Sequence, residues 1–308
     1  MRVVAFGGGH GLGASLRALR ATGLPLEITA VVTVADDGGS SGRLRADRGS
    51  LPPGDLRQAL AALAGEDRVS VGSAALFQYR FPGDDALAGH PVGNLVLCGL
   101  LEMVGNPVLA LEHAAAMVGA VGRVLPMACE PLGIEADLDQ GHRVITVRGQ
   151  HEVAVAPGRV LEVRIIPPAP LACAEAIAAI AEADWLLFGP GSWYTSVIPH
   201  LLVPDLAKAI VASPARRLVT LNLAADNETA GLSLPDHLGA LARYLPDLRV
   251  DIVLVDSNAV PDPDPVANAA ESLGARIALA AVAVQDGTAR HDPVRMGQAL
   301  VPLLGTAR

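Results

Sequence analysis

The chain has 308 residues, of which 51% are hydrophobic but only 3% aromatic, and its formal net charge is −9. This acidic balance argues against non-specific binding of nucleic acid, which needs a basic face. The chain has no apolar stretch near the roughly 20 residues of a membrane span, so we expect a cytoplasmic protein without a membrane span. Its three cysteines, Cys98, Cys129 and Cys173, form no CxxC pair, and we expect them to be reduced and mostly buried.

Short β-like runs alternate with longer helical segments through the first part of the chain. The hydrophobic pattern predicts strands at Val3–Phe6 and Ile28–Val34. It predicts helices at about Gly13–Ala21, Leu56–Ala64, Asn94–Val104 and Val108–Val118. Residues 121–167 differ, because they contain many turn formers and little helical periodicity, and they predict a β-rich insertion with strands at Arg143–Val147 and Val160–Ile166.

The alternation of strand and helix returns after residue 170. A helix is predicted at Cys173–Ala183, and a final helix at about Pro293–Leu304. Strands are predicted at Trp185–Phe188, Leu218–Leu223, Ile252–Val255 and Arg276–Ala280. Alternating units of this kind predict an α/β fold with a mostly parallel sheet flanked by helices, and we expect residues 1–308 to form one domain that carries the β-rich insertion.

Polar clusters follow the predicted strands, and in open α/β sheets ligands bind beyond the carboxyl ends of strands. The first cluster is the run GGGHGLG, in which Gly9, Gly11 and Ala14 fit the pattern G-x-G-x-x-A. Its backbone, with Gly8 included, is a candidate phosphate cradle at a helix N-terminus, although a tight turn without ligand is the alternative. His10 would either hydrogen-bond a phosphate or complete the turn.

The second cluster is DDGGSSGR, which follows the second predicted strand and is expected to be a loop. Asp36 and Asp37 should point in opposite directions, because adjacent residues of an extended chain do. One carboxylate could hold a ribose, another hydroxyl or Mg²⁺ while the other caps the turn. Arg43 could pair with a phosphate, or instead with Asp47 at the surface. The remaining ligand candidates of this loop are Gly38, Gly39, Ser40 and Ser41.

Two further clusters stand at predicted helix starts. Asp55 follows Pro52-Pro53-Gly54, and it is either the N-cap of the next helix or a ligand to a metal ion, or both. Gly93 and Asn94 stand at another helix start, where a ligand contact and a role in the turn or cap are both open.

The last clusters follow the strands of the second half. Gly189, Gly191 and Ser192 resemble an anion-binding nest of backbone N–H groups. The next residues, Trp193 and Tyr194, could stack on a base or sugar or fill the core. Asn222 ends another strand and is a further candidate. No Ser-His-Asp elbow and no zinc-binding pattern occurs.

Several specific blocks occur in one order: GGGHGLG, VTVADDGGSSGRLR, LPPGDLR, GHPVGNL, FGPGSWYTSVIPHLLV and NETAGLSLPDHL. Over roughly residues 2–245, the chain resembles the gluconeogenesis factor family, the YvcK-type branch of a superfamily that also holds the CofD-like 2-phospho-L-lactate transferases. The other branch shares the first glycine loop and the aspartate pair but lacks the GGSSGRLR and PPGD blocks.

This resemblance implies a Rossmann-like fold and a nucleotide-type ligand, which in this branch is a UDP-sugar such as UDP-N-acetylglucosamine. The implied role concerns cell shape and envelope synthesis during growth on gluconeogenic carbon sources, with no reaction attached to it. The alternative from the other branch is a Mg²⁺-dependent enzyme that moves a phospholactyl group from a guanosine diphosphate carrier to a deazaflavin. Its candidate Mg²⁺ ligands here would be Asp36, Asp37 and Asp55.

The chain departs from the family pattern at two places. His10 replaces the usual threonine of the first loop, a change associated with actinobacterial members. The segment from Asp226 to Thr229 is one residue shorter than usual, which leaves Glu228 and Thr229 as candidate ligand contacts. The Rossmann-like start also suggests an NAD-dependent oxidoreductase, but nothing resembles the acid/base pair that hydride transfer needs. A homo-oligomer remains open as a partner besides the phosphorylated small molecule.

Overall fold

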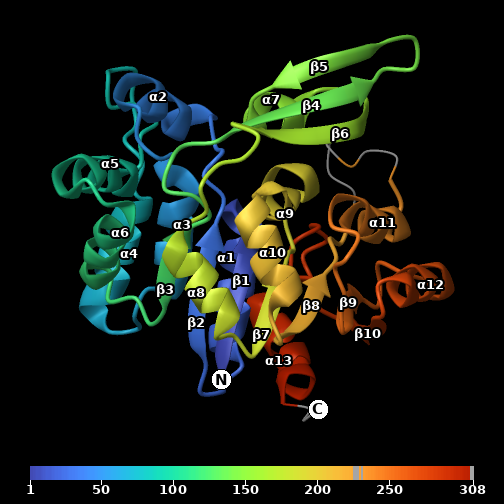
Figure 1. Cartoon of the computed structure of the whole chain (residues 1–308). Coiled ribbons are helices and arrows are strands. Elements are labelled where there is room, and N and C mark those ends of the chain that lie inside the picture. The colour runs from blue at the N-terminus through green and yellow to red at the C-terminus, as the bar shows by residue number, and fades with distance from the viewer. Residues whose placement is uncertain (225–228, 230–231, 306–308) are drawn as a thin grey trace.

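A seven-stranded parallel sheet runs through the middle of the molecule in the order β10-β9-β8-β7-β1-β2-β3 (Figure 1). The structure is a computed structural model that describes residues 1–224, 229 and 232–305. The strands are β1 (Arg2–Gly7), β2 (Glu27–Val32), β3 (Arg123–Pro126), β7 (Trp185–Phe188), β8 (Arg216–Thr220), β9 (Ile252–Asp256) and β10 (Arg276–Ala280). The predicted α/β class with a mostly parallel sheet is confirmed.

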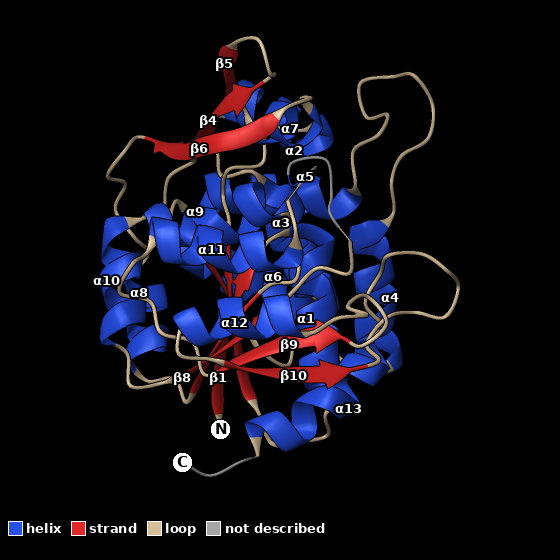
Figure 2. Cartoon of the chain, turned by 90° about the vertical axis from the view of Figure 1, so that its right-hand side faces the viewer, coloured by secondary structure: helices blue, strands red, loops and turns tan. Residues whose placement is uncertain are grey.

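The central strands are buried on both faces because helices cover the sheet from both sides. Every residue of β7 and β9 is buried, as near-continuous apolar runs in a parallel sheet require. Figure 2 shows two helical layers, one on each side of the sheet. One layer contains α1 (Gly9–Ala21) and α13 (Pro293–Leu304), and the other contains α8 (Ala174–Ala181) and α10 (Pro204–Ala212).

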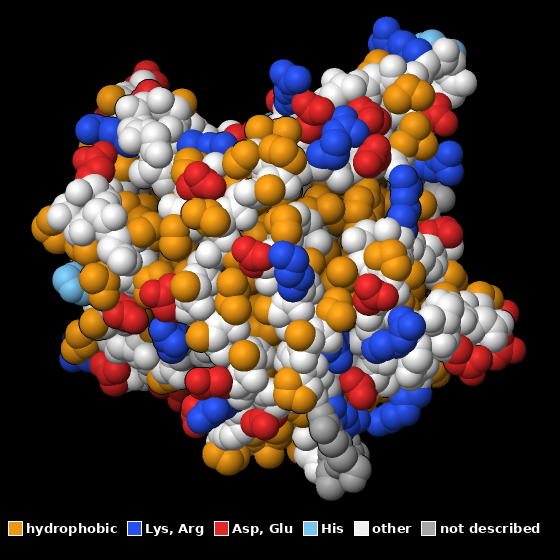
Figure 3. All heavy atoms as spheres, in the orientation of Figure 1, with side chains coloured by type: hydrophobic (Ala, Val, Ile, Leu, Met, Phe, Trp, Pro, Cys, Tyr) orange, Lys and Arg blue, Asp and Glu red, His pale blue; other side chains and the backbone are white. Residues whose placement is uncertain are grey.

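The remaining helices complete the two layers and the edges. They are α2 (Gly39–Arg48), α3 (Pro53–Leu63), α4 (Arg68–Gln78), α5 (Val92–Val104), α6 (Pro107–Met117), the short π-helix η1 (Trp193–Val197) that continues into α9 (Ile198–Leu202), α11 (Leu234–Tyr244) and α12 (Asp264–Ser272). Within the described residues, no single helix is long and apolar enough to cross a membrane; Trp193–Leu202 and Pro204–Ala212 meet that test only together, with an 80° bend between them. On the face seen in Figure 3, acidic and basic side chains of the described residues are interspersed.

The predicted β-rich insertion is present as a second, three-stranded antiparallel sheet in the order β5-β4-β6. It consists of β4 (Gly133–Asp139), β5 (Val144–Arg148), the short helix α7 (Gln150–Val155) and β6 (Arg159–Ile166). It begins later than residue 121, because β3 pairs in parallel with β2 and is the edge strand of the main sheet. The insertion stands above the carboxyl ends of the central strands in Figure 1.

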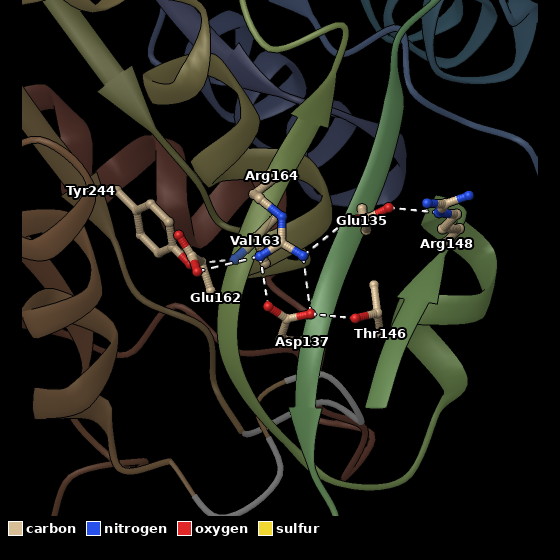
Figure 4. A network of polar contacts seen from close by, with 8 residues as sticks. All are labelled: Glu135, Asp137, Thr146, Arg148, Glu162, Val163, Arg164 and Tyr244. Atoms are coloured by element: carbon tan, nitrogen blue, oxygen red, sulfur yellow. Dashed lines mark hydrogen bonds and ion pairs between the residues drawn. The ribbon is translucent and has the colours of Figure 1, made fainter. Parts of the chain in front are cut away.

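A network of polar contacts connects the strands of the insertion to one another and to helix α11 (Figure 4). Arg164 of β6 donates hydrogen bonds of 2.6 and 3.0 Å to Asp137 and one of 2.9 Å to Glu135, both on β4. These bonds from Arg164 lower the pKa of Asp137 to about 2. The Val163 backbone N–H donates to the Tyr244 hydroxyl of α11 at 2.7 Å, so the insertion is also tied to the helical layer.

The predicted loop at Asp36–Arg43 is confirmed for Asp36–Gly38 and wrong from Gly39 onward, because Gly39 already begins helix α2. The first turn of α2 packs tightly against the preceding segment at Gly42, where a Cβ would lie 1.9 Å from the Asp37 carbonyl oxygen. Glycine and serine favour loops in isolation, and here tertiary contacts override that preference. Helix α1 likewise begins at Gly9, earlier than its predicted start near Gly13.

Candidate functional site

The order of strands in the main sheet reverses between β1 and β7. From β1 the chain moves outward to β2 and β3, and it then returns to β7 on the other side of β1. The segments that leave these strands touch at the first turn of α1: a Cβ on Gly11 would lie 2.3 Å from the Pro190 carbonyl oxygen and 2.5 Å from the Gly191 Cα. Open α/β sheets bind ligands at such a reversal, so this is the expected place for a site.

A cavity of ≈ 760 Å³ opens at this reversal, a size that suits a small-molecule ligand. Its wall combines the first turn of α1, the chain after β2, helix α3, helix α7 and the segments after β7, β8 and β10. The predicted site residues in this wall are Gly8, Gly9, His10, Gly11, Asp36, Gly38, Asp55, Gly191, Ser192 and Asn222.

The first turn of α1 lines the cavity with the backbone of Gly9, His10 and Gly11, of which the Gly9 N–H is hydrogen-bonded to the Asp55 carboxylate. The N-cap of this helix is Gly8, which has no side chain to accept a hydrogen bond from the first turn. The Gly8 carbonyl accepts the first intrahelical hydrogen bond, from the Leu12 N–H at 3.1 Å. A helix N-terminus with free N–H groups and a positive dipole end favours phosphate oxygens. His10 is exposed at the same turn and lines the cavity.

The two adjacent aspartates point apart, as the alternation of an extended chain predicts. Asp36 lines the cavity, and its Oδ1 accepts a hydrogen bond of 3.0 Å from the Gly38 N–H. Asp37 turns toward the insertion, where its Oδ1 accepts a hydrogen bond of 2.9 Å from the His151 N–H. Asp36 is therefore placed to meet a ligand, and Asp37 positions the insertion.

Asp55 is a buried carboxylic acid in the cavity wall. Burial raises its pKa to about 7, and the nearby Asp36 charge adds to the rise, while the Gly9 N–H and Arg57 oppose it. The N-cap of α3 is Pro52, so the predicted capping role of Asp55 is wrong. The Asp55 side chain instead extends from α3 to the start of α1, where a Cβ on Gly8 would lie 2.3 Å from the Asp55 Oδ2.

Replacing Asp55 with asparagine should change how stability depends on pH. The rise from the ordinary 3.8 to about 7 corresponds to a penalty on the order of 4 kcal/mol for the ionised form. In the wild type, the contribution of Asp55 to stability is fully present below pH 3.8 and is lost as the pH rises to about 7. The asparagine side chain would keep an acceptor for the Gly9 N–H without carrying a charge.

We therefore expect Asp55→Asn to exceed the wild type in free energy of unfolding by on the order of 2–4 kcal/mol at pH 8, with a smaller difference near pH 5. Urea denaturation of both proteins from pH 5 to pH 8 measures this. A difference that does not change with pH would show that Asp55 has an ordinary pKa.

The side-chain amide of Asn222 joins the segments after β7 and β8 by two hydrogen bonds. The Asn222 Oδ1 accepts from the Gly191 N–H at 2.9 Å, and its Nδ2 donates to the Gly191 carbonyl at 2.9 Å. This fixes the loop that Gly11 approaches. The aromatic pair that follows is in the core: Trp193 is fully buried and donates to the His237 carbonyl, and Tyr194 is 6% exposed. Core filling, one of the two alternatives for these aromatic residues, is therefore what the structure shows.

Several predicted site residues lie outside the cavity wall and have structural partners. The Ser40 hydroxyl contacts the His90 Nδ1 at 2.8 Å and accepts from the Asn94 Nδ2 at 2.9 Å, while Arg57 donates to the Asn94 Oδ1 at 2.8 Å. Asn94 therefore serves neither as a helix cap nor as a lining residue, because this buried network satisfies its side chain.

The other predicted residues outside the wall are held by packing or by the backbone. Gly93 packs on Phe77, Gly189 approaches the Thr220 carbonyl, and Arg43 donates to the Ala88 carbonyl at 2.7 Å. Gly39, Ser41 and Thr229 also lie outside the cavity wall. Glu228 lies outside the described residues.

Other wall residues were not expected from the sequence. Arg17 and Gln58 line the cavity from within helices α1 and α3, whereas the sequence predicted only the first residues of these helices as site residues. Arg290 and His291 follow β10, so the rule that ligands meet strand ends could have found them. Burial lowers the pKa of His291 to about 4, so this ring is uncharged at neutral pH. Gln150 and His151 come from the insertion, which no strand-end rule covers.

The described part of the chain contains no group of three or more histidine, cysteine, aspartate or glutamate side chains arranged to hold a metal ion. A Mg²⁺ ion at this cavity would therefore have to use ligand oxygens or water in addition to Asp36 and Asp55. The three cysteines are free; Cys98 and Cys173 are buried as expected, and Cys129 is exposed.

The model of the family described as 2-phospho-L-lactate transferase CofD matches residues 3–283 of this chain. A protein from Mycobacterium leprae, provisionally named a gluconeogenesis factor, is 47% identical over 306 residues, which cover 97% of this chain and 84% of the relative. The gluconeogenesis factor of Bacillus subtilis is 36% identical over 262 residues, which cover 85% of this chain and 80% of the relative.

The crystal structure of a upf0052 family member from Bacillus halodurans has a similar fold. It superposes with a TM-score of 0.87 at 32% sequence identity, and the match covers 97% of this chain and 98% of the other. The similarity therefore includes both the main sheet and the insertion.

Proposed function

Because this chain belongs to the 2-phospho-L-lactate transferase CofD family, we propose that its cavity binds a ligand built on a nucleoside diphosphate, and that this ligand is a UDP-sugar such as UDP-N-acetylglucosamine. The observation that carries the proposal is the first turn of α1, which opens into a cavity of ≈ 760 Å³ where Gly11 meets Gly191. Such a turn suits a diphosphate, and the cavity has room for the groups on either side of it.

The wall chemistry supports a ligand with distinct parts. Arg17 supplies positive charge, which suits phosphate oxygens, whereas the Arg290 guanidinium is paired with Asp286 at 2.7 Å. Leu223 and Val284 supply apolar surface, which suits the flat face of a base. Asp36 supplies a carboxylate acceptor, which suits hydroxyl groups.

The proposed role is that of a cytoplasmic regulator of cell shape and envelope synthesis during growth on gluconeogenic carbon sources. Two lines support it: the relatives named gluconeogenesis factors, and the sequence blocks that distinguish their branch from the transferases. A regulator of this kind needs to bind its nucleotide-sugar reversibly, and the cavity described above would be the sensor.

Calorimetric titration with UDP-N-acetylglucosamine, UDP-glucose and GDP tests the proposal. We expect binding of at least one UDP-sugar and weaker binding of GDP. At a ligand concentration 100 times its Kd, the free energy of unfolding should also rise by about 2.7 kcal/mol. The absence of heat and of thermal stabilisation with both UDP-sugars would overturn the proposal.

A second candidate function is a Mg²⁺-dependent phospholactyl transferase. The observation in its favour is the proximity of Asp36 and Asp55, whose mutual repulsion helps to raise the pKa of Asp55 to about 7. A divalent cation between two such carboxylates would offset that repulsion and balance phosphate charge. Incubation with Mg²⁺, a guanosine diphosphate-linked phospholactate and a deazaflavin acceptor tests this activity; no transferred product would count against it.

A further inference from the structure

Among the described residues, the insertion contributes to the cavity wall only through the short helix α7. Three residues of α7 line the wall: Gln150, His151 and Ala154. No residue of β4, β5 or β6 lines the cavity. A whole supersecondary unit thus contributes one helix face to the site.

This helix is held in place from two directions. The Asp37 carboxylate accepts the His151 N–H at 2.9 Å, and Gly149 lies so close that a Cβ there would be 2.5 Å from the Asp37 Oδ2. From the other direction, the Gln150 Nε2 donates to the Thr195 carbonyl at 2.9 Å. Since these bonds connect α7 to the segments after β2 and β7, the helix keeps a fixed position over the reversal of strand order.

The side chains of α7 retain hydrogen-bonding capacity that the protein does not use. Among the described residues, no hydrogen bond reaches the His151 imidazole or the Gln150 Oε1. The base of the imidazole lies beside the Gly38 backbone: a Cβ on Gly38 would lie 3.6 Å from the His151 Cγ. An amide oxygen and an imidazole therefore stand at the cavity wall beside Asp36.

The charges of the cavity differ between its two sides. Asp36 lies after β2 beside Gly38, against which α7 packs through His151. Arg290 follows β10 at the far edge of the sheet, where it forms an ion pair with Asp286 at 2.7 Å. The Asp36 carboxylate disfavours a second anionic group on the α7 side. Amide, imidazole and carboxylate acceptors instead match a group rich in hydroxyl and N–H donors.

We propose that α7 carries specificity-determining residues, and that His151 and Gln150 hydrogen-bond the uncharged, hydroxyl-bearing group attached beyond the diphosphate. The proposal rests on the proposed function and deepens it by assigning the sugar to the insertion and the α7 side of the cavity. The insertion then acts as the element that distinguishes a nucleotide-sugar from the bare nucleotide.

Calorimetry with His151→Ala tests the assignment, using UDP and UDP-N-acetylglucosamine as the two probes. The side chain of His151 is exposed and its docking bond comes from the backbone N–H, so the variant should fold. We expect the affinity for UDP-N-acetylglucosamine to fall by roughly threefold to tenfold and the affinity for UDP to stay unchanged. The matched control is His142→Ala, which removes an exposed histidine of the insertion outside the cavity wall and should change neither affinity.

The outcomes separate the two proposals. If the wild type binds UDP and UDP-N-acetylglucosamine equally well, or if His151→Ala weakens both or neither, the role of α7 is overturned while nucleotide binding stands. If the wild type binds neither probe, the proposed function fails and this inference fails with it. A selective loss of the UDP-sugar in His151→Ala alone supports the assignment.

Discussion

Gly11→Ala should destabilise the protein and abolish most of its UDP-sugar binding. The new Cβ would lie 2.3 Å from the Pro190 carbonyl oxygen and 2.5 Å from the Gly191 Cα, well inside contact distance. Both neighbours are backbone atoms that cannot rotate away, so the first turn of α1 and the segment after β7 would have to separate. We expect the free energy of unfolding to fall by about 1–3 kcal/mol, and affinity for the ligand to fall at least about tenfold, or 1.4 kcal/mol.

Gly99→Ala is the matched control for this substitution. Gly99 lies inside helix α5, and a Cβ there would meet nothing within 4 Å. Because alanine is favoured over glycine inside a helix, this variant should gain about 0.5–1 kcal/mol in stability and bind ligand normally. Thermal denaturation and calorimetry of both variants measure the contrast. Equal behaviour of the two would mean that the two segments do not touch as described.

Asp256→Ala should strongly destabilise the protein. The Asp256 carboxylate, at the end of β9, accepts four backbone N–H bonds of 2.8 to 3.1 Å. The donors are Asn258, Ala259, Val282 and Ala283. Burial raises the pKa of Asp256, but these four bonds outweigh that effect and hold the pKa below its ordinary value.

Removing this carboxylate leaves the four donors without their acceptor, and we expect a loss of about 3–5 kcal/mol in the free energy of unfolding. In the wild type, the contribution of Asp256 is present above its ordinary pKa and is lost as the pH falls through its lowered folded-state value. Chemical denaturation at neutral pH measures the loss. Asp205→Ala, which removes an exposed aspartate paired with Lys208, is the control and should cost less than about 1 kcal/mol. A loss of similar size in both variants would contradict the structural role of Asp256.

The same substitution should also weaken ligand binding. Val282 and Ala283, which Asp256 holds, lead directly into Val284 of the cavity wall. The segment from Val284 to Pro293 would lose its attachment to the sheet. This links the stability of β9 to the shape of the site.

The strands and the strand-end loops were predictable from the sequence because their signals are local. β7 and β10 have the predicted bounds, Trp185–Phe188 and Arg276–Ala280. β7 is a continuous apolar run and is buried throughout, as a central parallel strand should be, whereas β10 is the partly exposed edge strand. The divergence of Asp36 and Asp37 follows from the geometry of an extended chain. The glycine loop before α1 carries a pattern that needs no tertiary information.

The features that the sequence did not show depend on contacts between distant residues. Ser40 and Asn94 have the chemistry of ligand contacts, but they are 54 residues apart and satisfy each other. The bond between Asp37 and the His151 N–H joins residues 114 positions apart and brings α7 to the cavity. Helix propensity likewise gives no signal for α2, whose glycines and serines depend on the packing around them.

The position of the diphosphate in a crystal of the protein with UDP-N-acetylglucosamine tests the central claim most directly. The account predicts that phosphate oxygens lie at the backbone N–H groups of the first turn of α1, beside Gly191, with the sugar on the side of α7. A diphosphate bound elsewhere on the molecule, with this cavity empty at saturating ligand, would contradict it.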